Sequence, residues 1–278
     1  VLIAAIWLVV YPEKSEAAIK SGIRLCIDVV VPSLFPFFAA SALIVELGGA
    51  RYAGIGMSKI MQKAFSINGT CAAALVMGLL SGYPVGAKTA VQIYKKGMCT
   101  KKEAQRMLSF CNNSGPGFII GTVGVSMLGN TKAGILLYIV HVLSAISTGI
   151  VFKFYKREKG KKMKRGNIDF AVSKPMEALT NSVTSALSSM LSVCAFVIFF
   201  SLVIAMIEDS LLLKNILMFL NAKFGVDLSI AKGLLSSFIE VTSGTLEISK
   251  AEISYRGKLA ICAYALGWAG ISVHCQTM

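Results

Sequence analysis

The chain has 278 residues, of which 55% are apolar and only 15% are charged. Soluble domains carry about a quarter charged residues, and several apolar runs here approach the roughly 18 residues that suggest a membrane-spanning helix. The composition therefore excludes an ordinary soluble globular domain. It predicts an all-α integral membrane protein whose first partner is the lipid bilayer.

The formal net charge is +14, and the densest basic run is KFYKREKGKKMKR at 153–165, with eight Lys or Arg residues and one Glu. We interpret this run as part of a cytoplasmic loop that follows the positive-inside rule. A patch for anionic lipids is an alternative. We expect no nucleic-acid partner, because no aromatic-interleaved domain surrounds the run.

The seven cysteines are scattered, mostly inside apolar segments, and form neither a CxxC motif nor a cluster with histidine. We interpret them as small buried hydrophobes and infer no disulfide, no metal site and no cofactor. The sequence also has no Ser/His/Asp set, no HExxH motif, no paired carboxylates and no phosphate-binding loop. We therefore expect a protein that is not an enzyme and has no catalytic residues.

The first ten residues, VLIAAIWLVV, are too short to span a membrane, and they read as the end of a helix that begins upstream. The first long span covers roughly 22–48. Pro32 and Pro36 should kink it, and Arg24 and Asp28 are one turn apart, so we expect them to form a pair.

An interfacial amphipathic helix at 51–66 is followed by two interrupted elements. Residues 69–97 form two apolar arms on either side of SGYPVGA, and each arm has about a dozen residues, half of a membrane span. This pattern predicts a re-entrant hairpin, with one kinked full-length helix as the alternative. The segment 101–129 is a span broken near its middle by CNNSGPG at 111–117, and 132–152 is an unbroken span.

The second half of the chain repeats this order of segments. Its segments are a long span at 181–207, an interfacial helix at 211–224, a hairpin at 228–250 with the tip VTSGT, and a span at 253–278 interrupted around Gly267 and Gly270.

The two long spans point in opposite directions when the basic clusters are placed in the cytoplasm, with 22–48 running inward and 181–207 running outward. This relation predicts an inverted-topology repeat with two re-entrant hairpins and two interrupted transmembrane helices, as in many secondary transporters. We divide the chain into a first repeat (1–152), a basic cytoplasmic loop (153–175) and a second repeat (176–278). The second repeat lacks a counterpart of the last span of the first, so we expect it to be truncated at its C-terminal end.

Open backbone at membrane depth is tolerated only where protein or a water-filled cavity satisfies its polar groups. The two tips and the two broken spans should therefore meet near the midplane, where half-helix N-termini suit an anionic or polar ligand. The candidate substrate-binding residues are Ser81, Gly82, Tyr83, Lys88, Asn112, Asn113, Ser114, Glu240, Thr242, Ser243 and His274.

The candidates of the first repeat have structural alternatives. Asn112 and Asn113 have enough donors and acceptors to read a nucleobase or sugar edge, but they could instead join helices or satisfy the broken backbone. Lys88 at membrane depth is a functional candidate, and its alternative is to reach toward the cytoplasmic face.

The candidates of the second repeat have alternatives too. Glu240 could bind a coupling cation or a substrate hydroxyl, or pair with Lys232 or Lys250 at the rim. The hydroxyls of the second tip could cap its helix ends. His274 could carry a proton or be a hydrogen-bonded interior residue.

Three motifs resemble the YlbJ family of sporulation integral membrane proteins from endospore-forming bacteria: SGYPVGAKTA at 81–90, FCNNSGPGFIIGTVGV at 110–125 and GWAGISVHCQ at 267–276. PSLFPFF in the first long span fits too. That family carries the nucleoside-recognition, or Gate, domain, which also occurs in concentrative nucleoside transporters and in ferrous-iron transporters of the FeoB kind. The resemblance implies a sporulation role and a multi-pass protein of a bacterial cell membrane, with the forespore and mother-cell membranes as candidates.

In nucleoside transporters the substrate lies between two re-entrant hairpin tips and two unwound helices. By similarity, these elements correspond here to 81–88, 111–117, 240–245 and 267–274. A nucleoside-like solute is therefore one candidate substrate.

Two functions follow from these observations. The first is a secondary transporter or permease for a small polar solute, with a coupling ion; it predicts a hydrated midplane pocket lined by both tips. The second is a non-transporting membrane scaffold or sensor needed for spore formation, which predicts that apolar side chains fill the same space. Analogy with the domain class adds a homo-oligomer as a partner.

Overall fold

The computed structural model describes residues 2–48, 52, 56–57, 59–155, 174–225 and 227–277. All regular elements within these residues are helices. Most of the predicted basic loop and part of the predicted interfacial helix at 51–66 lie outside the described residues.

The helices of the first half are α1 (Leu2–Val10), α2 (Pro12–Leu25), η1 (Cys26–Val30), α3 (Val31–Glu46), η2 (Met61–Phe65), η3 (Gly69–Cys71), α5 (Ala72–Ser81), α6 (Val85–Lys95), α7 (Lys101–Leu108), η4 (Gly117–Met127) and α8 (Thr131–Phe152). Those of the second half are α9 (Pro175–Asp209), α10 (Leu211–Phe224), α11 (Leu228–Ile239), α12 (Val241–Lys250), α13 (Tyr255–Trp268) and α14 (Gly270–Gln276). The elements η1, η2 and η4 are π-helical, and η3 is a 3₁₀ turn.

Four helices among the described residues are long and apolar enough to cross a membrane. They are Pro12–Glu46, which joins α2, η1 and α3, then α8, α9, and Tyr255–Gln276, which joins α13 and α14. Large apolar side chains such as Leu136 and Leu143 of α8 are exposed on them. Helices satisfy their own backbone groups in lipid, so the protein is an all-α membrane protein, as predicted.

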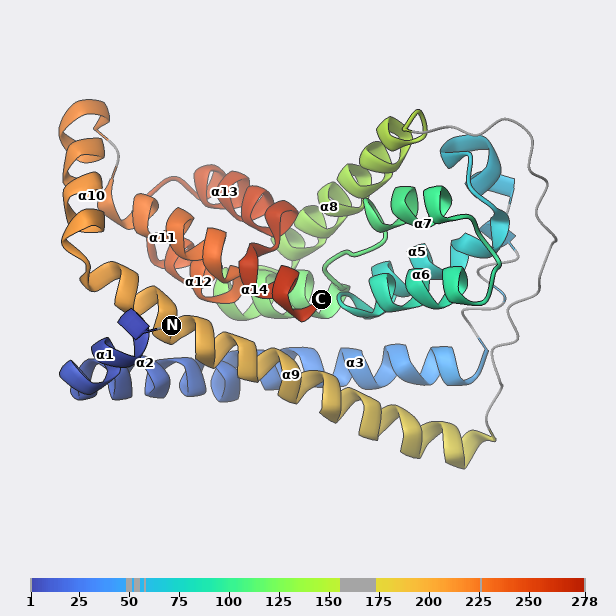
Figure 1. Ribbon diagram of the computed structural model, residues 1–278, viewed down its shortest axis with the longest axis horizontal. Helices are drawn as coiled ribbons and strands as arrows, with labels where there is room; N and C mark the ends of the chain where they lie inside the picture. The colour runs from blue at the N-terminus through green and yellow to red at the C-terminus, as the bar shows by residue number, and fades with distance from the viewer. Residues whose placement is uncertain are drawn as a thin grey trace.

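The two longest helices, Pro12–Glu46 and α9, lie side by side and run in opposite directions (Figure 1). Lys14 Nζ is 2.7 Å from Asp209 Oδ1 near one end, and further along the Cys26 thiol reaches the Cys194 carbonyl oxygen at 3.7 Å. Between these two contacts the residue numbers rise along the first helix and fall along α9, so the two helices form an antiparallel pair. The inverted arrangement requires this relation of these two helices; the symmetry of the remaining elements stays a prediction.

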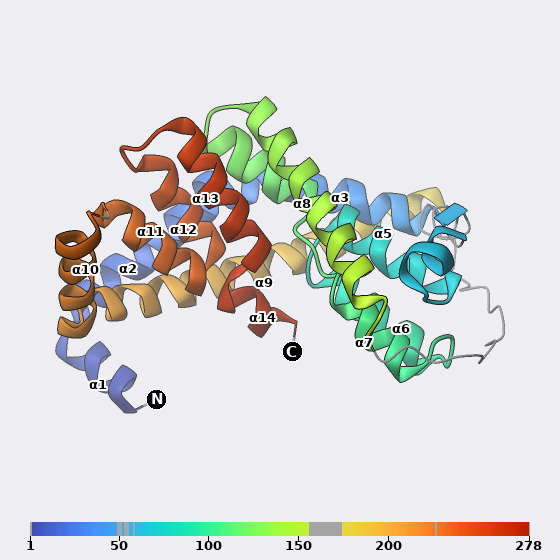
Figure 2. The same ribbon diagram turned by 90° about the horizontal axis from the view of Figure 1, so that it is seen from above.

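Two helical hairpins, α5–α6 and α11–α12, lie toward opposite ends of this long pair and point their tips toward the middle (Figure 1, Figure 2). The first hairpin is interrupted at 82–84, and the span that follows it is non-helical at 111–115. The second hairpin breaks at Glu240 and the last span at Ala269. The interruptions of the first half therefore lie where the sequence predicted them.

The second tip lies earlier in the chain than predicted. Its break is Glu240, which has extended backbone (φ −142°, ψ 116°), and VTSGT at 241–245 forms the first turns of α12. Gly244 is helical and lies against α11, where a Cβ atom would be 2.1 Å from the Ser237 nitrogen. This glycine therefore allows two helices to approach closely and does not bend the chain.

The first long helix also differs from the prediction, because it begins at Pro12 and not near residue 22. The π-helical turn η1 interrupts its regular winding just before Pro32. Residues four apart no longer share a face in a π-turn. Accordingly, the expected pair of Arg24 and Asp28 is not among the ion pairs of the described residues.

The main hydrophobic core joins both halves of the chain around the two tips. Its buried members include Leu34 of α3, Phe118 of η4, Val193 of α9, Val241 of α12 and Val273 of α14. This core holds both hairpin tips against the antiparallel pair of long helices.

Candidate functional site

The first tip touches the first helix break through main-chain atoms. A Cβ atom at Gly78 would lie 1.7 Å from the Cys111 carbonyl oxygen, and one at Gly86 would lie 1.9 Å from it. Gly82, at φ +77°, is packed so closely against Gly115 that a Cβ atom would be 2.9 Å from its nitrogen. Only glycine fits these positions, so the sequence brings the hairpin and the broken span into direct backbone contact.

Side chains satisfy part of the backbone that the first break leaves open. Asn113 Nδ2 donates to the Phe110 carbonyl oxygen at 2.9 Å. The Ser114 amide donates to His141 Nε2 of α8 at 3.1 Å, which requires that nitrogen to be unprotonated. Asn113 and the Ser114 amide therefore hold the break, which is the structural alternative for these residues.

The second tip is held by Glu240. Its carboxylate accepts hydrogen bonds from the Thr242 amide at 2.9 Å and the Ser243 amide at 2.6 Å, and the residue is buried. Lys250 pairs with a different residue, Glu247, at 3.4 Å. Glu240 thus caps the N-terminus of α12 and makes no ion pair with a rim lysine among the described residues.

The two hairpins therefore present opposite charges at their tips. The N-terminus of α6 follows Pro84, which offers no side-chain cap, and the exposed Lys88 lies one turn further on. The N-terminus of α12 is already neutralised by the Glu240 carboxylate. Of the two half-helix N-termini predicted to attract an anionic group, the uncapped one is that of α6.

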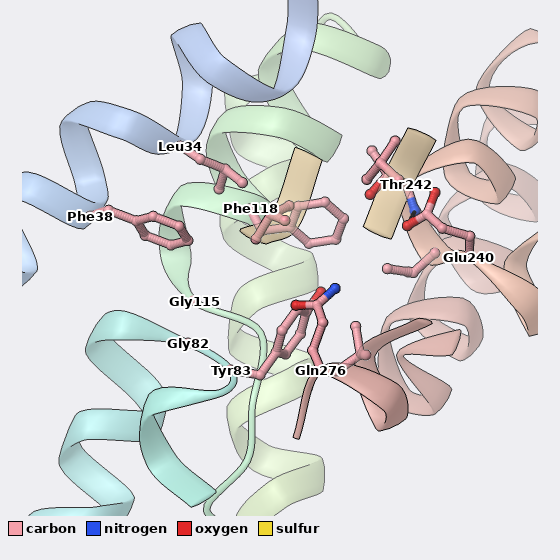
Figure 3. A pocket seen from close by; sticks show the side chains of 13 residues that line it. Leu34, Phe38, Gly82, Tyr83, Gly115, Phe118, Glu240, Thr242 and Gln276 are labelled. Atoms are coloured by element: carbon pink, nitrogen blue, oxygen red, sulfur yellow. Dashed lines mark hydrogen bonds between the residues drawn. The ribbon is translucent and has the colours of Figure 1, made fainter. Parts of the chain in front are cut away.

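A small cavity lies between the two tips and is called the tip cavity here (Figure 3). Its volume is about 20 Å³, room for a single water molecule. Figure 3 shows Glu240 and Thr242 on one side of it and Tyr83 beside Gln276 on the other. The rest of its lining is mainly apolar and comes from the long helices, η4, α12 and α14: Leu34, Phe38, Phe118, Val193, Val197, Val241 and Val273.

Two larger cavities adjoin this region. One of about 290 Å³, called the serine cavity, lies between α3, α6 and α9 and includes Ser81, Tyr83 and Lys88 in its lining. One of about 760 Å³, called the histidine cavity, is lined by Lys88, Asn112 and His274 among others. Lys88 and Gln276 line both larger cavities.

The predicted site residues are thus divided among three spaces. Gly82, Glu240 and Thr242 line the tip cavity, and Tyr83 lines both the tip cavity and the serine cavity. Asn113, Ser114 and Ser243 line none of these three cavities. The ring of His274 stands edge-on to Trp268, with ring centroids 5.2 Å apart.

Most of the buried polar atoms without a hydrogen-bond partner lie on three elements of the site: the first break, the second hairpin and α14. Among the described residues there are seven such side-chain atoms, and one belongs to Arg106. Unpaired buried polar groups are rare, and each calls for an explanation. The other six lie on the first break, the second hairpin and α14: Asn112 Oδ1, Ser114 Oγ, Ser236 Oγ, Ser243 Oγ, Ser272 Oγ and Gln276 Oε1.

Sequence reasoning did not select several of the lining residues. Gln276 lines all three cavities, and Phe38 lines two of them. Four serines of α9 also line the serine cavity, and their i, i+3, i+4, i+7 spacing was the available signal: Ser185, Ser188, Ser189 and Ser192.

The fold and the site define a multi-pass membrane protein built around two facing hairpin tips and two broken spans. A family model described as Gate, nucleoside recognition, matches residues 27–152. The chain is 31% identical over 290 residues to the sporulation integral membrane protein YlbJ of Bacillus subtilis (strain 168), a match that covers 96% of this chain and 70% of the relative. The chain therefore belongs to the YlbJ family of sporulation integral membrane proteins, and it is a multi-pass protein of a bacterial membrane. No solved structure matches this chain.

Proposed function

We propose that this protein is a secondary transporter, or permease, for a small polar solute that binds where the hairpin tips meet the broken spans. The observation that carries the proposal is the set of six unpartnered polar atoms on the first break, the second hairpin and α14. Two of them, Asn112 Oδ1 and Gln276 Oε1, belong to residues that line the histidine cavity, so a polar molecule held there would satisfy them. Passage of a solute, and no catalysis, is the role that we propose.

Hairpins that enter from opposite ends suit alternating access. Tyr83 of the first tip and Glu240 of the second line the same cavity, so withdrawal of either hairpin would open that cavity toward one end only. The tip cavity holds about 20 Å³, far less than the roughly 300–1,000 Å³ of ligand pockets. Transport therefore requires the tips to separate, and the proposal includes a coupling ion that drives this separation.

The charges at the tips favour a particular orientation of the solute. An anionic or acceptor-rich group fits the uncapped N-terminus of α6 and the Lys88 ammonium group. A hydroxyl or amine donor fits the free lone pairs of the Glu240 carboxylate. A nucleoside-like solute remains one candidate of this kind.

A thermal-shift panel of nucleosides, amino acids and other polar metabolites on the purified full-length protein tests the proposal. We expect at least one compound class to raise the midpoint of thermal unfolding, and we expect Asn112→Ala to reduce that shift. Uptake of the same compound into proteoliposomes then tests transport itself. A panel without any stabilising compound would count against the proposal.

The alternative function is a membrane scaffold or sensor that retains this fold without transporting. The observation that favours it is the apolar lining of the tip cavity by Leu34, Phe38 and Phe118. Under this alternative, variants that block movement of the hairpins leave spore formation intact, whereas under the transport proposal they abolish it. A homo-oligomer fits both functions, and the mass of the detergent-solubilised protein measures it.

A further inference from the structure

The serine cavity has a wall of hydroxyl groups that the proposed function has not used. Four serines of α9 are spaced i, i+3, i+4, i+7, so they lie on one face of the helix, which is called the stripe here: Ser185, Ser188, Ser189 and Ser192. All four line the cavity of about 290 Å³. A membrane helix gains nothing from such a polar face unless protein or water meets it.

The hydroxyls of these four serines differ from the other hydroxyls of the same helix. Thr180, Ser182, Thr184 and Ser201 each donate to the carbonyl oxygen four residues earlier, the usual way for a hydroxyl to be satisfied within a helix. Within the part of the chain that the structure describes, none of the four hydroxyl groups of the stripe makes a hydrogen bond to another protein atom. Their donors and acceptors are available to a molecule in the cavity.

The opposite wall comes from different elements. Ser81 and Lys88 belong to the first hairpin, and Gln276 belongs to α14. The Lys88 ammonium makes no ion pair among the described residues, and Gln276 Oε1 is buried without a hydrogen-bond partner. A molecule in this space would therefore touch a fixed long helix on one side and the hairpin tip on the other.

We propose that the serine cavity is a second, aqueous solute site, in which the α9 hydroxyls hold a small molecule rich in hydrogen-bonding oxygen or nitrogen atoms and poor in apolar surface. Tyr83 and Gln276 line both this cavity and the tip cavity, so a solute held here lies directly beside the tips. The inference rests on the proposed transport function in one respect, because it places this second site on the path that the transported solute takes.

Single cysteines test whether the stripe faces water. Ser188→Cys and Ser192→Cys place thiols in the cavity, and Leu187→Cys and Leu191→Cys place matched thiols at neighbouring exposed positions that do not line it. The variants carry Cys275→Ser, because Cys275 is the exposed native thiol among the described residues. The probe is 2-sulfonatoethyl methanethiosulfonate, which does not partition into lipid, applied to the full chain in proteoliposomes.

We expect the serine-derived thiols to react at least tenfold faster than the leucine-derived thiols. Equal rates would overturn the inference. Ser185→Cys and Ser189→Cys repeat the measurement on the same stripe, so the pattern can be read even if one variant does not fold.

The result separates this inference from the proposed function. If the thiols of the stripe react fast but no compound in the thermal-shift panel stabilises the protein, the aqueous cavity is supported and the transport proposal is contradicted. Any stabilising compound should also slow modification of Ser188→Cys. A compound that stabilises the protein and leaves this rate unchanged binds elsewhere, which would leave transport standing and overturn the second site.

Discussion

Gly78 of α5 lies against the carbonyl oxygen of Cys111, at a separation that leaves no room for a side chain. A Cβ atom at Gly78 would be 1.7 Å from that oxygen. The contact joins the first hairpin to the first break, so it decides whether the site can assemble.

Gly78→Ala should therefore destabilise the protein, because the backbone of the break must move to admit a methyl group. Overpacking of this kind costs about 1–3 kcal/mol, and we expect a lower midpoint of thermal unfolding in detergent. Gly267→Ala is the matched control, since Gly267 is helical and a Cβ atom there meets nothing within 4 Å. Its midpoint should be unchanged or higher. Equal losses in both variants would contradict the close contact.

Glu240→Ala should weaken the second tip, because it leaves the buried amides of Thr242 and Ser243 without their acceptor. The expected loss is about 2 kcal/mol, the range for a lost cap or an unsatisfied buried donor. Glu247→Ala on the same helix is the control, since it removes an exposed ion pair with Lys250 that is worth about 0–1 kcal/mol. Thermal unfolding of the two variants side by side measures the difference, and the capping role fails if they are equally stable.

The two adjacent asparagines should respond differently to substitution. Asn113→Ala removes a hydrogen bond to the Phe110 carbonyl oxygen and should lower stability by about 1 kcal/mol, without changing the shift that a bound solute produces. Asn112→Ala removes a carboxamide that faces the histidine cavity and should reduce that shift with little effect on the unliganded protein. Thermal unfolding with and without a stabilising compound separates the two effects. If Asn113→Ala reduced the ligand-induced shift and Asn112→Ala lowered stability, the roles assigned to the two asparagines would be wrong.

The antiparallel register of the long helices predicts a specific cross-link. A Cβ atom at Gly22 would lie 3.2 Å from the Ser201 Cβ atom, close to the separation of about 3.5–4.5 Å found in disulfides. The double variant Gly22→Cys, Ser201→Cys should form a disulfide under mild oxidation, detected as a linked peptide pair by mass spectrometry. Gly22→Cys with Ser189→Cys should not, because 12 residues of helix separate the two α9 positions by about 18 Å. A linked pair in that control would refute the register.

The interruptions of the first half could be predicted because local chemistry determines them. Glycine and proline in SGYPVGA, and glycine, proline and asparagine in CNNSGPG, disfavour helix where several of them stand together, as they do here. The second tip was placed too late because Gly244 has the composition of a turn but serves close helix packing. The sequence cannot distinguish these two uses of glycine, since the neighbour that decides between them, Ser237, comes from another helix.

Other features of the site depend on partners that are distant in sequence. The sequence around Glu240 did not indicate that backbone amides of α12, and not a rim lysine, would bind its carboxylate. The spacing of the α9 serines places them on one helical face, but the sequence does not show what that face meets; the structure places Lys88 and Gln276 across the cavity from it. Tertiary placement, and not residue type, determines which of these polar groups meet.

The glycine contacts between the first tip and the first break also bear on how such proteins diversify. Main-chain atoms make these glycine contacts, so the close fit itself needs no side chain from either glycine. We therefore expect substitution of Lys88 or Asn112 to leave the backbone contact between the tip and the break in place. Under the transport proposal, we expect relatives that keep these glycines to change their solute preference through few substitutions.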